Sequence, residues 1–240
     1  IHGTVEGLVD TDDDGESDGA EVIGNADPDN SAITSNFVTY RALQINGAAD
    51  TYLALPQQDR FRLDTYTIEA WIQPAADSAA MDGDEANIVA RSVEAGRHQY
   101  RLYLKDTEAG AGVTLQLVGE YNIASSTTAI SVNSGATAIV DDASTFTHVA
   151  LSFDGNDILR LYIDGVEVDD AETAAVPVDN GEGPTYTRIG AGFDGKIDDV
   201  RFWSTARSEA DLQAEMGVVQ SSNLGDLVSY FRFDDGTSMT

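Results

Sequence analysis

The 240-residue chain contains no cysteine, and Lys105 and Lys196 are its only lysines. Without cysteine, both disulfides and thiolate-ligated zinc sites are excluded. No stretch approaches the roughly 18 consecutive apolar residues that a transmembrane helix needs, so we expect no membrane insertion. Hydrophobic residues still make up 42% of the chain. That fraction is ample for the core of one large domain, and global disorder is not expected.

Basic residues are scarce: 13 Lys and Arg stand against 42 Asp and Glu, and the formal net charge is −29. Such a surface repels the phosphate backbone of nucleic acids, so nucleic acid is not expected as a partner. The charge suits calcium held in defined loops, and a concentrated salt medium that screens like charges from one another. An acidic, lysine-poor surface is typical of halophilic and marine proteins.

An acidic run near the N-terminus has the spacing of a twelve-residue calcium loop. Gly15 stands at the sixth position, where the chain turns sharply, and Glu16 offers its backbone carbonyl at the seventh. The remaining ligand positions are acidic throughout: Asp10, Asp12, Asp14, Asp18 and Glu21. The spacing predicts one bound Ca²⁺; the alternative is a solvated acidic linker.

The segment around this loop resembles the thrombospondin type 3 calcium repeat of bacterial surface proteins. The acidic motif is followed by Gly24-Asn25-Ala26-Asp27-Pro28, the turn that closes such a repeat. Residues 1–9, with glycine at positions 3 and 7, are too poor in helix formers for the first helix of an EF-hand. The resemblance covers about residues 8–30. It implies that residues 1–36 form a calcium-binding stalk.

From Tyr40 onward, short alternating runs separated by Gly, Asn and Asp turns predict β-strands. Asp154-Gly155-Asn156-Asp157 predicts a tight hairpin turn. The one convincing helix is Glu209–Met216, with Ser208 as its N-cap and Asp211 placed for a capping box. Many strands and almost no helix indicate an all-β fold, either a sandwich or a jelly roll.

The sequence of the predicted strands resembles that of laminin G-like, pentraxin-like domains over roughly residues 37–236, and the matching segments follow one another in the same order as in that family. The segments that carry the resemblance are Arg41–Gly47, Tyr66–Ile72, Leu159–Gly165, Gly195–Trp203 and Tyr230–Phe233. The resemblance implies that residues 37–240 form a concanavalin A-like jelly-roll sandwich of two antiparallel sheets. Members of this family mostly bind sugars, proteins or cell surfaces, which favours an extracellular or cell-surface location.

A hydrolytic centre is not expected in this sandwich. Enzymes of the same fold place carboxylates at alternate strand positions, as in Glu-x-Asp-x-Glu, and no such run occurs here. Glu69 is followed by Ala70-Trp71-Ile72 and has no second carboxylate on its strand. A lone strand histidine such as His148 is more often structural than catalytic. Trp71 and Trp203 are expected in the sandwich core rather than as sugar-stacking platforms.

The resemblance also implies a second, structural calcium ion between the turn after the first strand and a late strand. The matching positions are Asn46, Gly47, Asp50 and Asp198. Carboxylate and carbonyl oxygens suit this hard cation. The alternative is that Asp198 lies on a solvated strand face.

Ligand sites on such scaffolds usually lie on loops. The least strand-like segment is residues 75–87, and residues 120–122 and 179–182 are further candidate loops. Tyr121 and Tyr186 are the aromatic residues expected to be exposed in loops. The candidate ligand-binding residues are Asp82, Asp84, Glu85, Asn87, Tyr121 and Asn122. Two functions stay open. One is a calcium-dependent module that recognises a carbohydrate or cell-surface protein; the other is a self-associating spike, fibre or envelope component.

Overall fold

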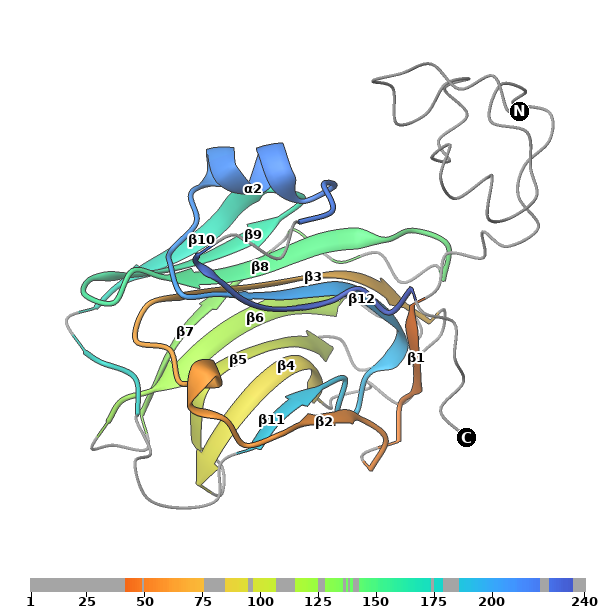
Figure 1. Ribbon diagram of the computed structural model, residues 1–240, viewed down its shortest axis with the longest axis horizontal. Helices are drawn as coiled ribbons and strands as arrows, with labels where there is room; N and C mark the ends of the chain where they lie inside the picture. The colour runs from red at the N-terminus through yellow and green to blue at the C-terminus, as the bar shows by residue number, and fades with distance from the viewer. Residues whose placement is uncertain are drawn as a thin grey trace. The chain divides into compact units, whose positions relative to one another are not determined.

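The computed structural model describes residues 42–48, 50–75, 85–94, 97–106, 115–124, 128–135, 137, 139, 143–173, 175–178, 186–220 and 225–234. Two antiparallel sheets lie face to face and form a sandwich (Figure 1). The predicted all-β jelly-roll class is therefore confirmed. The predicted boundary at residue 36 lies outside the described residues, as do these predicted site residues: Asp10, Asp12, Asp14, Glu16, Asp18, Glu21, Asp82 and Asp84.

The first sheet has seven strands, in the order β1 (Leu43–Asn46), β12 (Asp194–Trp203), β3 (Tyr66–Pro74), β8 (Thr147–Phe153), β9 (Ile158–Ile163) and β10 (Val166–Glu172). The seventh strand, β13 (Leu227–Phe231), also pairs with β12. The strand β1 pairs with the first half of β12 and β13 with its second half. The two short strands therefore share one edge of the long strand.

The second sheet has six strands, in the order β2 (Leu53–Leu55), β11 (Tyr186–Ile189), β4 (Glu85–Glu94), β5 (Arg97–Asp106), β6 (Leu115–Asn122) and β7 (Ala129–Asn133). A 3-10 turn, η1 (Asp59–Phe61), connects β2 to the first sheet. Between the sheets, alternate residues form one hydrophobic core. Aromatic rings cross the layers, for example Tyr66 against Tyr100 and Tyr121 against Phe153.

The strand β4 is irregular, and the irregularity decides which of its side chains face outward. The β4–β5 register shifts between Asn87 and Val89. Ile88 and Val89 are both fully buried in the core, whereas Asn87 and Ala90 are not part of it. In a regular strand, residues 87 and 90 would face opposite sides; the bulge puts both on the outer face.

The local predictions for the hairpin and the helix are confirmed. Asp154 Oδ1 accepts three backbone N–H groups, from residues 156, 157 and 158, and this closes the β8–β9 turn. The helix α2 (Glu209–Glu215) begins at Ser208, whose side chain and that of Asp211 form both bonds of a capping box. Within the described residues no helix is long and apolar enough to cross a membrane.

Candidate functional site

A row of side chains crosses the outer face of the six-stranded sheet. Residues directly opposite one another in neighbouring strands point to the same face. The register gives the row as Ala54, Arg188, Ala90, Arg101, Glu120 and Ser131, from β2 to β7. With a strand spacing of about 4.8 Å, the Cα atoms of Arg188 and Arg101 lie about 10 Å apart. Only the methyl group of Ala90 stands between them in the row.

Arg101 holds a cluster of polar groups in the middle of this face. Its Nη1 lies 2.7 Å from Glu85 Oε2 and 3.2 Å from Glu120 Oε1, and its Nε donates to Asn87 Oδ1 at 2.6 Å. The guanidinium carbon lies 3.8 Å from the ring centroid of Tyr103. The Glu85 side chain is 39% exposed and that of Arg101 only 10%. The Glu85 carboxylate is therefore the accessible hydrogen-bond acceptor of the cluster.

Two groups beside this cluster keep their neutral forms. Burial raises the pKa of Tyr103 above its ordinary value, and Glu120 and Glu85 add to the effect. Burial lowers the pKa of His98 to about 4, with a further contribution from the positive charge of Arg101. Tyr103 therefore remains a phenol and His98 an uncharged imidazole near neutral pH.

Arg188 lies in a second cluster, between two tyrosine rings. Its guanidinium carbon is 4.3 Å from the ring centroid of Tyr52 and 5.4 Å from that of Tyr186. Tyr186 is 51% exposed. Among the residues that the structure describes, no carboxylate forms an ion pair with Arg188. This cluster places an exposed aromatic ring and a cation side by side at the β2–β11 edge of the face.

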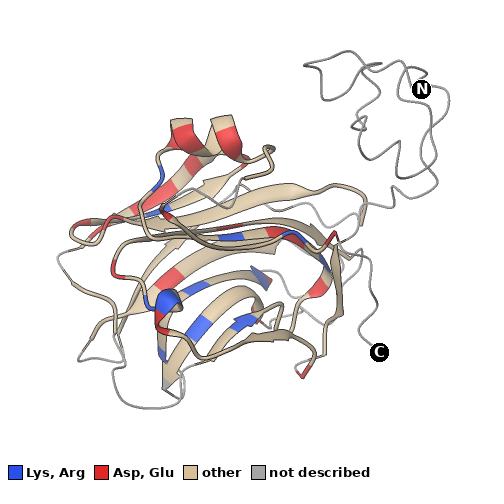
Figure 2. Ribbon diagram, in the orientation of Figure 1, with Lys and Arg blue, Asp and Glu red and all other residues tan. Residues whose placement is uncertain are grey.

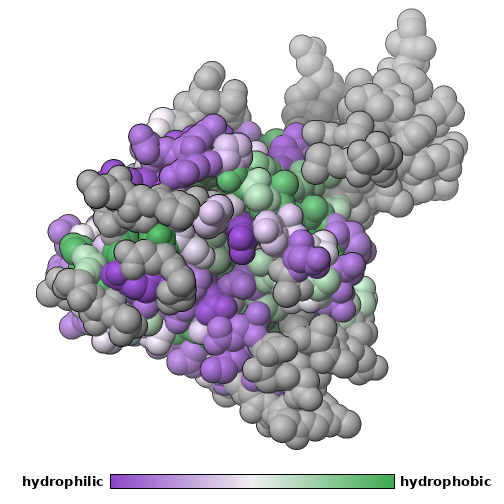
Figure 3. Space-filling view, turned by 90° about the horizontal axis from the view of Figure 1, so that it is seen from below, coloured by the Kyte–Doolittle hydropathy of each residue, from purple (hydrophilic) through white to green (hydrophobic). Residues whose placement is uncertain are grey.

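Charge is distributed unequally between the two sheets. The strands of the six-stranded sheet contain five basic and four acidic residues. Those of the seven-stranded sheet contain three basic and eight acidic residues. The net charges are thus +1 and −5. Figure 2 shows acidic residues along α2 and β10 and basic residues along strands of the six-stranded sheet. From below, the side on which β2, β11 and β4 lie, hydrophilic residues gather in the middle of the face (Figure 3).

Two of the predicted ligand-binding residues belong to this face, but they lie on a strand. Glu85 and Asn87 begin β4, so the predicted loop over residues 75–87 is wrong for its last three residues. Their side chains meet only through Arg101, which the sequence analysis did not single out. The signal for Arg101 was present: positions 97, 101 and 105 are basic in a chain with few basic residues, and they alternate with apolar ones.

The predicted loop over residues 120–122 is also wrong. These residues end β6, and Tyr121 is fully buried with its ring centroid 5.1 Å from that of Phe153. Its hydroxyl donates to the carbonyl of Ala175 at 2.6 Å. Asn122 is buried and accepts the backbone N–H of His98 at 2.6 Å. Of the two tyrosines expected to be exposed, only Tyr186 is, and it starts β11 rather than lying in a loop.

The four positions predicted for a second calcium ion do not form one site. Asn46 pairs with Asp194, whereas Asp198 lies four residues further along β12, about 13 Å away. Gly47 donates its N–H to Phe193, and Asp50 is exposed in the following turn. The described part of the chain holds no group of three or more His, Asp or Glu side chains placed to bind a metal ion. The structure therefore does not bring Asn46 and Asp198 together, and calcium at these positions stays a prediction.

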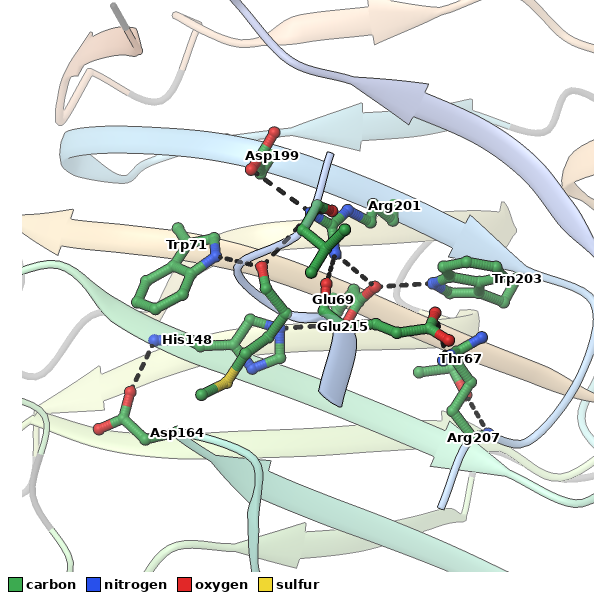
Figure 4. Close-up of polar contacts among 12 residues, drawn as sticks. Thr67, Glu69, Trp71, His148, Asp164, Asp199, Arg201, Trp203, Arg207 and Glu215 are labelled. Atoms are coloured by element: carbon green, nitrogen blue, oxygen red, sulfur yellow. Dashed lines mark hydrogen bonds and ion pairs between the residues drawn. The ribbon is translucent and has the colours of Figure 1, made fainter. Parts of the chain in front are cut away.

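A buried polar network lies on the outer face of the other sheet, under α2 (Figure 4). Glu69 Oε1 accepts from Trp203 Nε1 at 2.7 Å and from Arg201 Nη1 at 3.4 Å, and Oε2 contacts His148 Nε2 at 3.0 Å. Burial alone would raise the pKa of Glu69, but the hydrogen bond and charge of His148 and the charge of Arg201 outweigh it and lower that pKa. Arg201 also donates to the carbonyls of residues 215, 216 and 218, which end the helix.

This network explains the roles of the residues that it contains. Glu69 is 2% exposed and enclosed by three partners, so its carboxylate has a structural role. The His148 imidazole that contacts it has a structural role as well. Trp203 is buried as expected, yet it lies outside the core between the sheets. Trp71 is only half-buried and donates its Nε1–H to the Met216 carbonyl at 3.0 Å. The prediction that both tryptophans fill the sandwich core is therefore wrong: Trp71 contacts the end of α2, and Trp203 donates a hydrogen bond to the buried Glu69.

Comparison with known proteins places this geometry in a family. The chain matches no curated protein. Among solved structures it is similar to a candidate carbohydrate binding protein from Bacteroides ovatus, with 20% identity and a TM-score of 0.56 over 79% of this chain and 50% of that one. It thus spans half the length of the Bacteroides protein.

A second similar structure is the IT-sialidase CBM40 of Ruminococcus gnavus bound to α2,3-sialyllactose, with 16% identity and a TM-score of 0.56 over 74% of this chain and 97% of that one. A third is the leech intramolecular trans-sialidase, with 16% identity and a TM-score of 0.58 over 75% and 28%. At such identities the likeness shows a shared fold. Residues 46–213, more than half of the sequence, match the family model itself. The chain belongs to the concanavalin A-like lectin/glucanases superfamily.

Proposed function

We propose that this chain is a non-catalytic recognition module that holds a carbohydrate across the outer face of its six-stranded sheet. The observation that supports this most directly is the cluster of Tyr52, Arg188 and the exposed Tyr186. An exposed ring stacks on the apolar face of a sugar, and the carboxylate of Glu85, further along the same face, accepts hydrogen bonds from the hydroxyls of another sugar unit. Two of the similar structures are described as carbohydrate-binding, which agrees with this proposal.

The arrangement of carboxylates supports binding rather than hydrolysis. Glu85 and Glu120 both contact the same guanidinium group, that of Arg101, which suits hydrogen-bond acceptance better than proton transfer. Glycosidases instead set two carboxyl groups on either side of the scissile bond and give them different roles. Glu69 is enclosed on the opposite sheet.

Binding is tested with a glycan array, followed by calorimetric titration of each glycan that binds. Tyr186→Ala should weaken affinity about two- to tenfold, the effect of losing ~0.5–1.5 kcal/mol of aromatic contact. Val166→Ala is the matched control, because Val166 is 50% exposed on the other sheet and should leave affinity unchanged. The proposal fails if no glycan binds, or if both variants bind as the unaltered chain does.

We further propose that residues 10–21 bind one Ca²⁺ and that the module acts outside the cell, as a calcium-dependent unit. The support is the ligand spacing in the sequence. Calorimetric titration with CaCl₂ should give one site in the unaltered chain and none in Asp14→Ala. An equal stoichiometry in the two proteins would contradict this assignment. Repeating the array with a chelator shows whether carbohydrate binding needs the ion.

A further inference from the structure

Arg188 differs from three other arginines of the sheets. Arg101, Arg160 and Arg201 each contact two carboxylates within 4 Å. Arg188 contacts two tyrosine rings, and no ion pair with a carboxylate is found for it in the described part of the chain. In a protein with 42 acidic and 13 basic residues, a carboxylate partner would be easy to supply. The charge of Arg188 is therefore available to a ligand.

The side chains opposite Arg188 on the two adjacent strands are too small to cover its guanidinium group. Its register partners are Ala54 on β2 and Ala90 on β4, so the side chain on each side is a single methyl group. The rings of Tyr52 and Tyr186 contact the guanidinium and restrict its orientation. A guanidinium held in this way keeps the N–H groups at its edge free to donate in a fixed, planar fork.

The sheet that carries Arg188 also offers the more favourable field for an anion. Its strands have a net charge of +1, against −5 for the strands of the other sheet. The whole chain, at −29, repels anions at long range. A ligand anion would therefore bind by direct contact with this arginine, within the ~8 Å over which charges act at physiological salt.

We propose that the bound carbohydrate contains a carboxylate-bearing sugar, and that Arg188 binds the carboxylate. This inference rests on the proposed function of the same face and specifies its ligand class. A planar carboxylate matches the fork of a guanidinium bidentately. Arg101, about 10 Å away along the row, is already matched by Glu85 and Glu120, so its cluster would contact the hydroxyls of a neighbouring sugar.

The first test needs no variant. Calorimetric titration of the unaltered chain compares each acid with a neutral counterpart: trigalacturonate with its fully methylated ester, and 3′-sialyllactose with its methyl ester. It also compares 3′-sialyllactose with 3′-sulfolactose, which has the same charge on a sulfate. At least one carboxylated ligand should bind about tenfold or more tightly than its neutral counterpart, the scale of a charge-assisted hydrogen bond. Equal affinity of acid and neutral forms would overturn the inference, and so would a preference for the sulfated ligand.

Three variants then test the residue. Arg188→Gln should abolish the preference for the acid, and Arg188→Lys should keep only part of it because the fork is lost. Arg160→Gln is the control, because Arg160 is a half-exposed arginine on the opposite sheet, with a 28% exposed side chain, and the preference should persist. Thermal unfolding confirms that each variant is folded. If Arg188→Gln retains the preference, the assignment is wrong. If neutral glycans bind and acids are not preferred, only this inference fails; if no carbohydrate binds at all, the proposed function itself fails.

Discussion

Replacing Glu69 by glutamine should destabilise the protein strongly although the change is isosteric. In the native protein Glu69 accepts from Trp203, Arg201 and His148, all almost fully buried. Glutamine keeps one acceptor oxygen and puts an amide N–H₂ group against one of the three donors. His148 would then have to accept at Nε2 and carry its proton on Nδ1, which is buried without a partner.

The magnitude follows from these contacts. Removing one partner of a buried ion pair costs about 3–5 kcal/mol, and the lower end applies here because Arg201 keeps Asp199 and three backbone carbonyls. We therefore expect a loss of about 3 kcal/mol from a domain whose total stability is of order 5–15 kcal/mol. Glu167→Gln is the control. It removes an exposed pair with Arg160, worth at most about 1 kcal/mol.

Urea unfolding at fixed salt measures both variants, with an unchanged slope as the check that only stability has altered. The pH dependence adds a second signature. Because the folded-state pKa of Glu69 is lowered from 4.5, its contribution is fully present above that value and is lost as the pH falls through the lower, folded pKa. The difference between the native protein and Glu69→Gln should shrink over that acidic range. A loss below about 1 kcal/mol at neutral pH, equal to that of the control, would refute the structural role of this network.

Three further outcomes are expected. Tyr121→Phe should cost about 1 kcal/mol in urea unfolding by removing the hydrogen bond to Ala175, and should leave carbohydrate affinity unchanged. Gly195→Ala should cost at least about 1–3 kcal/mol, because φ is 138° and the new Cβ would meet the backbone of Gln73; Gly217→Ala, with open space around it, should cost much less. Raising NaCl from 0.15 to 1 M shortens the Debye length from ~8 to ~3 Å and should raise the melting temperature of this −29 chain; a lower melting temperature would show that self-repulsion is not the dominant charge effect.

The fold was predictable from local patterns, because alternation and turn chemistry act over a few residues. The α2 capping box and the Asp154 hairpin were both predicted at the correct residues. The strand β4 was missed in part because its bulge puts Ile88 and Val89 on one face, which breaks the alternation that marks a strand. The end of β6 was missed because the residues on either side of Tyr121, Glu120 and Asn122, are polar and are typical of a loop.

The candidate site was predictable only in part, because it is assembled by register. Glu85 and Asn87 were singled out, but their common partner Arg101 lies on the next strand, and Arg188 is 87 residues beyond that in sequence. Nothing local to one segment shows that two arginines will face the same side of a sheet with an alanine between them. The pairing of distant strands decides this, and local sequence patterns do not reveal that pairing.

The bulge in β4 places the Arg101 cluster and the Arg188 cluster on the same face of the sheet. Asn87 and Ala90 share a face only because one extra residue is accommodated between them. Removing Ile88 would make the pairing regular and leave Asn87 and Ala90 on the same face, whereas one more residue inserted between them would turn the Asn87 end to the interior while leaving Ala90 beside Arg188. Recognition by this sheet would therefore tolerate changes in the length of the surrounding loops far better than a residue inserted between Asn87 and Ala90, so insertions should accumulate in the loops and be absent from this part of β4.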